Sequence, residues 1–507
     1  MRTDTIELRL DTDAGGDAGG DVSGDGQGDV PGDTDTQPCT PIFSDRGWET
    51  TVSTGATYYI APAGGSDAPG QGLTQATPWA SFAHAWSMMV AGDTLLLLDG
   101  TYGTPLRPTI SGTVDAPITI RARNDGAVTI ETTGATNSCV VQGASSVDRL
   151  RYIHIAGIRC QSSLDVSNIA ASAVVIHYAS NITLRRVSAH TQSSVPTSRT
   201  VIVWSASDVL LEDVAATAGA VLPILLFEGA EPTERIILRR VWGYSGTPGA
   251  ANVFTVNGAS GNLLENVIAT MDPTNTSRSV GIAVGEAEMV RQFGNIVTNV
   301  DNWAFQVSSS SKRVQGNSLS NGVGIETQQG LAVQTDADFR ARDLTFTGQT
   351  GRGVFWGLQP EVKDSDFEMN AVVRNVNLAF AAQGVEITDS PLIRSIDIDF
   401  TNIFTVTTPY TARAMQMAND TSINPMYDVN RYGRGAFLLS PPDLAGLGEE
   451  GTTIGAEVLY RYENGCLTDE ALWPWPMEER IFSETGLSPT WEASGGLWKT
   501  LDGVYGP

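Results

Sequence analysis

The sequence is poor in the side chains that most often carry enzyme chemistry. Its 507 residues include four histidines, four cysteines and three lysines, Lys312, Lys363 and Lys499, beside 28 arginines. No His-Glu-x-x-His, Cys-x-x-Cys or phosphate-binding glycine loop occurs. The sequence therefore lacks the common signatures of zinc hydrolases, redox dithiols and nucleotide-binding loops.

Positive charge and long apolar runs are scarce as well. The formal net charge is −26, and a surface this acidic repels nucleic acids and anionic membranes. No stretch reaches the ~18 apolar residues of a membrane-spanning helix, and residues 1–10 lack the apolar region of a signal peptide. We expect no nucleic-acid partner and no membrane insertion.

A repeated motif is present in the middle of the chain. Leu-Arg-Arg-Val at Leu184 recurs as Leu-x-x-Val at Leu211, Leu238 and Leu264, in steps of 27, 27 and 26 residues. A fixed period in this range indicates a solenoid, in which each repeat buries its apolar face against its neighbours. The charges alternate between repeats, in the order Arg185, Glu212, Arg239 and Glu265, and again in the order Arg186, Asp213, Arg240 and Asn266. Stacked opposite charges attract, so this order predicts one coil lying over another.

Composition divides the chain into four regions. Residues 1–56 are expected to be an acidic, disordered tether, because the Asp/Gly-rich stretch 11–38 cannot bury apolar area. Residues 57–102 are expected to form a cap and the first coil, and residues 103–408 the remaining coils. Residues 409–507 form a tail rich in proline and aromatic residues. Its tryptophans, among them Trp473, Trp475, Trp491 and Trp498, are expected to pack on the coils, with a sugar-stacking surface as the alternative.

The opening of the folded region carries a recognisable pattern. A short strand at 58–62 is followed by helical spacing of apolar residues over 78–90, and then by a buried strand at 95–98. This stretch resembles the opening of secreted right-handed parallel β-helix proteins of the pectin lyase-like superfamily, which include chondroitinase B-like and alginate lyases. The tail, with Trp-Pro-Trp-Pro followed by acidic residues and arginine, looks like that of uncharacterised bacterial β-helix proteins. We predict an all-β, single-stranded right-handed parallel β-helix with an N-terminal helical cap and roughly ten to twelve coils.

The four cysteines allow two disulfides. Cys139 and Cys160 lie 21 residues apart, about one coil, so they could stack within bonding distance. Cys39 and Cys466 flank the two ends of the folded body and could join them. Free buried thiols are the alternative for all four residues.

Lys312, Arg340 and Lys363 are the candidate catalytic residues. They are separated by 28 and 23 residues, each about one coil, so they could line one face. Asp364 and Asp366, beside Lys363, could offer oxygen ligands to Ca²⁺. A lyase of uronic-acid polymers needs such a set, because a cation acidifies the carbon beside the carboxylate and a nearby base removes its proton. The alternative is a solvated charge ladder like the one at 185–265.

Two weaker candidates remain. His154 and His177 are 23 residues apart and could stack in adjacent coils, either structurally or as part of a metal site. Asp397 and Asp399 point to the same side of a strand about 7 Å apart, a separation compatible with the carboxylate pair of a glycoside hydrolase.

These patterns lead to one functional expectation with an open alternative. We expect an extracellular or surface-tethered, monomeric protein whose partner is a polysaccharide, and which acts as a lyase if the glycan is acidic. The alternative is a non-catalytic adhesin, glycan-binding module or structural protein of the cell envelope.

Overall fold

The computed structural model describes most of the chain from Cys39 onward. The described residues are 39–133, 137–162, 172–191, 199–218, 222–246, 252–274, 279–309, 314–334, 338–357, 369–390, 393–490 and 497. The tether at 1–38, Lys312, Lys363, Asp364, Asp366, Trp491 and Trp498 lie outside them. The unit considered below begins at Thr40. Among the described residues, no helix is long and apolar enough to cross a membrane.

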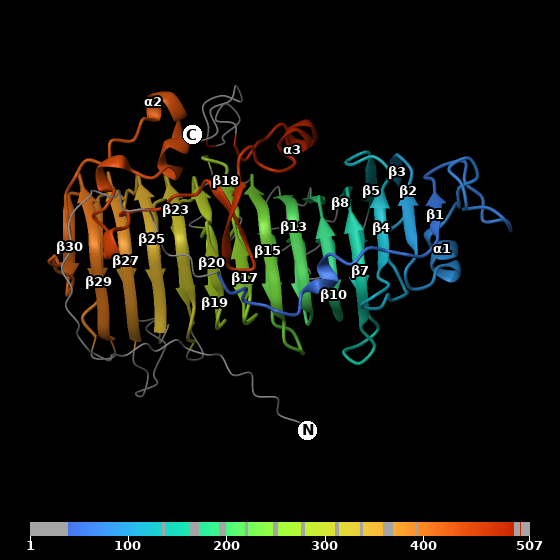
Figure 1. The fold of residues 1–507 in the computed structure, drawn as a ribbon, viewed down its shortest axis with the longest axis horizontal. Coiled ribbons are helices and arrows are strands. Elements are labelled where there is room, and N and C mark those ends of the chain that lie inside the picture. The colour runs from blue at the N-terminus through green and yellow to red at the C-terminus, as the bar shows by residue number, and fades with distance from the viewer. Residues whose placement is uncertain are drawn as a thin grey trace, which may run out of the picture. The chain divides into compact units, whose positions relative to one another are not determined.

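Parallel strands build a right-handed β-helix of about ten turns (Figure 1). A 19-stranded sheet bends once per coil, which gives it a first flank and a second flank, and an 11-stranded sheet forms the third face. The first flank contains β1 (Thr57–Ile60), β2 (Thr94–Leu97), β4 (Ile118–Ala122), β7 (Leu150–Ala156), β10 (Ala179–Arg185), β17 (Leu263–Glu265) and β20 (Arg291–Phe293). The second flank contains β3 (Gly100–Tyr102), β5 (Val128–Thr132), β8 (Ile158–Ser162), β11 (Ser188–Thr191), β18 (Ile268–Met271) and β21 (Ile296–Thr298). Six longer strands span both flanks: β13 (Ser207–Ala218), β15 (Glu234–Ser245), β23 (Ser318–Ile325), β25 (Asp338–Thr347), β27 (Met369–Ala379) and β29 (Ile393–Phe404).

The third face runs the length of the stack. Its strands are β6 (Cys139–Gln142), β9 (Ser172–His177), β12 (Arg199–Trp204), β14 (Leu222–Phe227), β16 (Phe254–Asn257), β19 (Ile282–Gly285), β22 (Trp303–Ser308), β24 (Gln329–Val333), β26 (Arg352–Trp356), β28 (Gln383–Ile387) and β30 (Thr408–Ala412). Each strand pairs in parallel with the strand one coil away. The predicted fold and coil number are therefore confirmed.

The repeated motif marks the bend between the two flanks. Leu184, Leu211, Leu238 and Leu264 stack in register in the core, and the alternating ladder from Arg185 to Glu265 lies on the outside. The next positions, Arg186, Asp213, Arg240 and Asn266, have φ values between 50° and 53°. This left-handed conformation turns the chain and is most accessible to Asn, Asp and Gly. Both predicted charge columns are confirmed as stacked positions.

The N-terminal end is closed as predicted. Helix α1 (Phe82–Met88) begins at the cap residue Ser81 and buries Phe82, Ala85 and Trp86 in the main core. Strand β1 pairs with β2 on one side, and on the other its residue Tyr59 exchanges backbone hydrogen bonds with Gly72 and Trp79. The edge of the first strand is therefore occupied, which opposes end-to-end stacking of chains.

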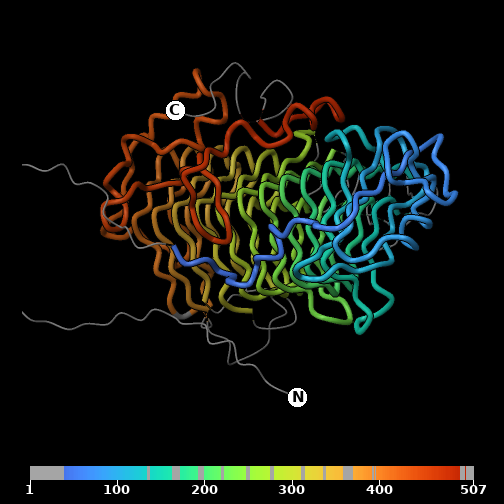
Figure 2. Tube along the Cα trace, turned by 45° about the vertical axis from the view of Figure 1, so that its right-hand side comes forward, coloured from blue at the N-terminus to red at the C-terminus, as the bar shows by residue number. Residues whose placement is uncertain are grey.

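The folded region begins earlier than expected. Residues 40–56, which composition assigned to the tether, form a segment that we call the strap, and Figures 1 and 2 show it in blue across the first flank. Phe43 and Trp48, the latter in a short 3₁₀ helix, η1 (Gly47–Glu49), pack against Leu210, Ile237 and Leu263. The composition-based boundary at residue 56 was therefore wrong for this segment.

Most of the tail lies along the second flank (Figure 2), but its first residues cover the last coil, where the backbone of Thr421 exchanges hydrogen bonds with Thr401 and Ile403. Trp473 and Trp475 are buried against outward side chains of that flank, including Trp242 and Ile268. The tail's elements are α2 (Val429–Tyr432), η2 (Arg434–Leu438), η3 (Pro442–Leu444), η4 (Glu449–Gly451), the hairpin β31 (Tyr460–Glu463) and β32 (Cys466–Ala471), and α3 (Glu478–Thr485). Burial leaves Trp473 and Trp475 unable to stack on a sugar.

The predicted disulfide between Cys139 and Cys160 is present, with the Cα atoms 6.0 Å apart. It joins the third face to the second flank, since Cys139 belongs to β6 and Cys160 to β8. No cysteine is a free thiol.

Candidate functional site

One column of outward side chains on the first flank changes character part-way along the stack. In coil order it consists of Thr57, Thr94, Thr119, His154, Thr183, Leu210, Ile237 and Leu263. Its apolar part holds the strap, because Trp48 packs there and is 4% exposed. Its polar part forms the floor of a pocket.

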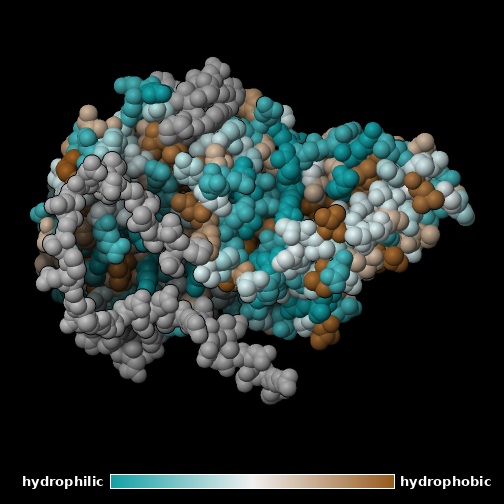
Figure 3. All heavy atoms as spheres, viewed as in Figure 1, coloured by the Kyte–Doolittle hydropathy of each residue, from teal (hydrophilic) through white to brown (hydrophobic). Residues whose placement is uncertain are grey.

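This pocket, which we call the strap groove, has a volume of about 450 Å³. Residues 49–53 of the strap form one wall, and the sheet contributes Thr94, Thr119, Arg121, His154, Thr183 and Arg185. Hydroxyl groups and guanidinium groups therefore lie beside apolar side chains in a pocket whose volume is in the range of ligand pockets. On the face seen in Figure 3, hydrophilic residues cover most of the middle of the stack, and hydrophobic residues form only small groups.

His154 sits in the centre of the polar column. It hydrogen-bonds to the backbone of Trp48, and burial, reinforced by the nearby charge of Arg185, lowers its pKa to about 4. Its imidazole is therefore neutral at neutral pH. Neither Nε2 of His154 nor the hydroxyl of the neighbouring Thr183 has a hydrogen-bond partner among the described residues.

Two cations face the groove in different states. Arg185 donates to Glu212 at 2.5 Å and to the carbonyl oxygen of Glu49 at 2.7 Å. Arg121 is exposed, and within the described part of the chain no carboxylate lies within salt-bridge distance of it. Arg121 is thus the free positive charge of the groove, and it stands out in a chain of net charge −26.

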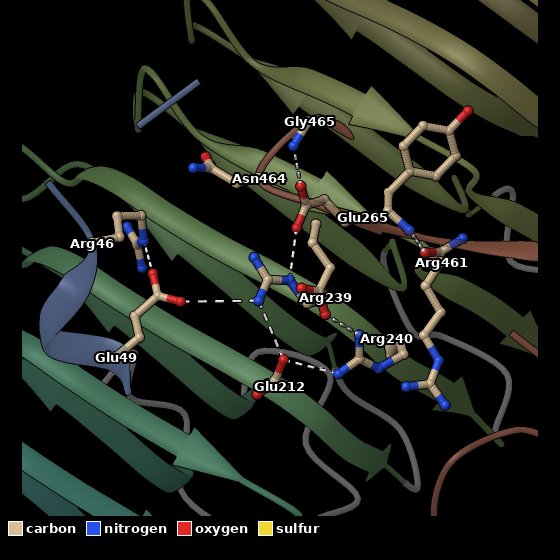
Figure 4. Close-up of polar contacts among 12 residues, drawn as sticks. Arg46, Glu49, Glu212, Arg239, Arg240, Glu265, Arg461, Asn464 and Gly465 are labelled. Atoms are coloured by element: carbon tan, nitrogen blue, oxygen red, sulfur yellow. Dashed lines mark hydrogen bonds and ion pairs between the residues drawn. The ribbon is translucent and has the colours of Figure 1, made fainter. Parts of the chain in front are cut away.

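Beside the groove the ladder becomes a buried ionic cluster (Figure 4). Arg239 contacts Glu265 at 2.9 Å and Glu212 at 3.2 Å. Burial opposes ionisation of Glu212, yet hydrogen bonding and charge from the surrounding arginines lower its pKa to about 2. Burial raises the pKa of Glu265, which is fully buried and accepts hydrogen bonds from Arg239 and from the backbone of Gly465.

The cluster joins three parts of the chain. Arg46 and Glu49 come from the strap, Glu212, Arg239, Arg240 and Glu265 from the ladder, and Gly465 from the turn of the β31–β32 hairpin. Asn464, in the same turn, exchanges hydrogen bonds with the backbone of Phe43 in the strap. The perturbed carboxylates thus hold the strap and hairpin on the sheet, and they are not open to a ligand.

The predicted catalytic residue Arg340 lies far along the first flank. It lies in β25, where it pairs with Ser318 on one side and with Val372 on the other, and Val372 pairs in turn with Asp397. The side chain of Arg340 is 65% exposed. Arg342 occupies the same column as Glu265, through Phe293 and Ser320. Arg340 and the neighbouring Arg342 therefore belong to the outer face that carries the charge ladder.

The two weaker candidates fare differently. The prediction that His154 and His177 stack is wrong, because His154 in β7 pairs with Thr183 and His177 in β9 pairs with Trp204, on another face. One coil spans 29 and 27 residues at these positions, so a separation of 23 falls short of a full turn. Within the described ranges no group of three His, Cys, Asp or Glu side chains is placed to hold a metal ion.

Asp397 and Asp399 both have structural partners. Asp397 receives a hydrogen bond from Arg374 at 2.5 Å, and Asp399 receives one from Asn419 at 2.8 Å. These contacts tie the last coils to each other and to the segment that follows them. Neither carboxylate faces a pocket together with the other.

The groove itself was missed from the sequence. Its signal was a series of outward threonines at coil spacing, Thr94, Thr119 and Thr183, with His154 in the same column. The strap that completes it was assigned to the tether, although Ile42, Phe43 and Trp48 are apolar residues that a disordered tether does not need.

Comparison with known proteins gives only distant structural matches. No protein-family model and no curated sequence matches the chain. Pectate lyase Pel9A is similar over 71% of this chain and 82% of its own, at 13% identity and a TM-score of 0.40. The surface adhesin PfbA of Streptococcus pneumoniae is similar over 64% and 85%, at 8% identity and a TM-score of 0.46. The PL6-family alginate lyase AlyGC is similar over 73% and 52%, at 13% identity and a TM-score of 0.48.

The chain has a parallel β-helix fold. Its own strand pairing establishes this, and the fold does not by itself specify an activity.

Proposed function

We propose that the protein is a surface-tethered or secreted β-helix that binds an acidic glycan in the strap groove. The observation that carries the proposal is the guanidinium of Arg121, which has no carboxylate partner among the described residues and lies in a pocket lined by several threonine hydroxyl groups. A guanidinium group binds a carboxylate through charge-assisted hydrogen bonds. Threonine hydroxyls both donate and accept, so they complement sugar hydroxyl groups.

The groove favours binding over cleavage. The nearest candidate base is His154, and a pKa near 4 makes it a weak proton acceptor at neutral pH. The carboxylate that lines the groove, Glu49, is buried and paired with Arg46. A lyase that uses Lys312, Arg340, Lys363 and calcium held by Asp364 and Asp366 remains the second proposal, because Arg340 presents an exposed cation on the same flank.

The test is a titration of wild-type protein with oligomers of galacturonate, mannuronate and glucuronate, with neutral oligosaccharides as the comparison. We expect selective binding of acidic oligomers, reduced at least tenfold in Arg121→Gln. Arg340→Gln is the matched control, since it removes one exposed arginine from the same flank and is expected to leave binding unchanged. Loss of binding in Arg340→Gln with retention in Arg121→Gln would move the site to the far coils.

Cleavage is followed in the same samples, with and without calcium. Ultraviolet absorbance of an unsaturated uronate reports β-elimination. We expect no increase; an increase abolished by Arg340→Gln would replace the binding proposal with the lyase.

A further inference from the structure

The strap lies over the path that a glycan would take along the stack. At one end Trp48 and Glu49 are fixed on the sheet, through Leu210 and through the bond from Arg185 to the Glu49 carbonyl oxygen at 2.7 Å. At the other end the backbone N–H of Gly55 donates to Gly92 at 2.7 Å and that of Ala56 to Asp93 at 2.8 Å. The Ser53 hydroxyl donates to the same Gly92 carbonyl oxygen, so residues 50–52 cross the intervening coils between these two anchors.

The dimensions limit how far this segment can open. Three coil steps separate β2 from β10 through β4 and β7, which is about 14 Å at the usual strand spacing. The four residue steps from Glu49 to Ser53 reach at most about 14 Å when fully extended. The segment therefore has little slack, and it cannot lift clear of the sheet while both anchors hold.

A chain lying along the polar column would meet both anchors. Beyond Thr183 the column continues as Leu210, which Trp48 covers. Toward the N-terminus it reaches Thr57, where the strap itself joins the sheet as β1. The floor of hydroxyl groups is therefore limited to a few coils, about the length of a short oligosaccharide.

We infer that the strap groove accepts the end of an acidic glycan chain, or a short free oligosaccharide, and excludes the interior of a long polymer. This inference rests on the proposed binding function and adds the part of the glycan that is recognised. Arg121 would take a carboxylate near that end, while Thr94 and Thr119 would contact neighbouring hydroxyl groups. The polar wall and the closed ends together define a site for a chain terminus.

The experiment measures the affinity of wild-type protein for a length series of whichever acidic oligomer binds, from the disaccharide to the parent polymer. End recognition predicts that the dissociation constant per chain stops changing once the groove is filled. It also predicts that chemical blocking of one chain end, but not of the other, weakens binding at least tenfold. A dissociation constant that falls in proportion to chain length, with insensitivity to both end modifications, would overturn the inference while leaving the binding function intact.

Two variants distinguish loss of glycan binding from loss of end recognition. Arg121→Gln is expected to weaken binding at every length, which reports on the binding function alone. Trp48→Ala is expected to raise the affinity for long chains relative to short ones by several-fold, because it loosens one anchor. An unchanged length profile in Trp48→Ala, in protein whose strap has become accessible to protease, would contradict the closed end. Absence of binding by wild type at all lengths would overturn both proposals.

Discussion

The ladder column behaves differently in two of its regions. Between Arg185 and Glu265 the strap and the β31–β32 hairpin bury it, and Glu265 is fully buried. Continued in register, the same column holds Arg342, whose side chain is 53% exposed. At the next position, Arg374, the tail covers the column again, because Glu449 contacts Arg374 at 3.0 Å and the Arg374 side chain is 14% exposed. Position in the coil is the same in both regions. What covers the column therefore decides whether a charge serves structure or only solubility.

The strongest test of this contrast is Glu265→Ala. It leaves Arg239 buried without the nearest of its three carboxylate partners, so we expect a loss of about 3–5 kcal/mol in the free energy of unfolding. Chemical denaturation followed by circular dichroism measures it. A loss below about 1 kcal/mol, typical of an exposed pair, would show that the cover contributes little.

The strap itself is tested by Trp48→Ala. Removing a buried tryptophan costs about 3–5 kcal/mol, and here the loss is expected to fall on the attachment of residues 40–56 to the sheet. Limited proteolysis should then cut within the strap while the circular dichroism of the β-helix stays unchanged. A strap that resists protease in this variant would mean that the ionic cluster holds it without the apolar contact.

The polar column makes stability depend on pH. Burial lowers the pKa of His154 from 6.5 to about 4, so the folded protein binds fewer protons than the unfolded chain between these values. The stabilisation that neutral His154 contributes is complete above about pH 6.5 and is lost as the pH falls toward 4. By about pH 5 the free energy of unfolding has fallen by roughly 2 kcal/mol. Thermal unfolding at several pH values should show this slope, and His154→Gln should reduce it but not abolish it, because burial also lowers the pKa of His177 and of His190. The carboxylate Glu212, with its pKa lowered to about 2, loses its contribution only below about pH 4.5, so the two effects separate.

The smallest effect is expected at the exposed part of the column. Arg342→Ala should change the free energy of unfolding by less than about 1 kcal/mol, because its contact with Asp343 is solvent-exposed. The same denaturation experiment as for Glu265→Ala measures it. Equal losses in the two variants would remove the distinction between the covered and the exposed ladder.

The sequence was sufficient for the fold because a solenoid repeats its signal. The Leu-x-x-Val motif gave the coil length and the register. The spacing of Cys139 and Cys160 allowed their disulfide, but the two residues lie on different faces and not in stacked positions. The histidine pairing failed because coils at His154 and His177 are 29 and 27 residues long. A period gives the mean spacing but not the length of each turn.

The groove could not be predicted because it depends on contacts between distant segments. Hydrogen bonds between Phe43 and Asn464 join residues 421 positions apart. The strap is not part of the repeat, so the coil period does not predict that it lies at Leu210. Its position there depends on the packing of Trp48 against Leu210. Outward threonines at coil spacing indicate a polar face. That this face is the floor of a pocket could be recognised only once the position of the strap was known.

Hydrogen exchange of the strap in the presence of the acidic oligosaccharide tests the central claim most directly. Residues 51–54 are partly or fully exposed, and residues 51–53 line the groove, so their amides should exchange rapidly in the free protein. The account predicts slower exchange in peptides covering 50–57 on binding, with no change in peptides covering 338–347. Protection confined to 338–347, or an unchanged strap in a protein that binds the glycan, would contradict it.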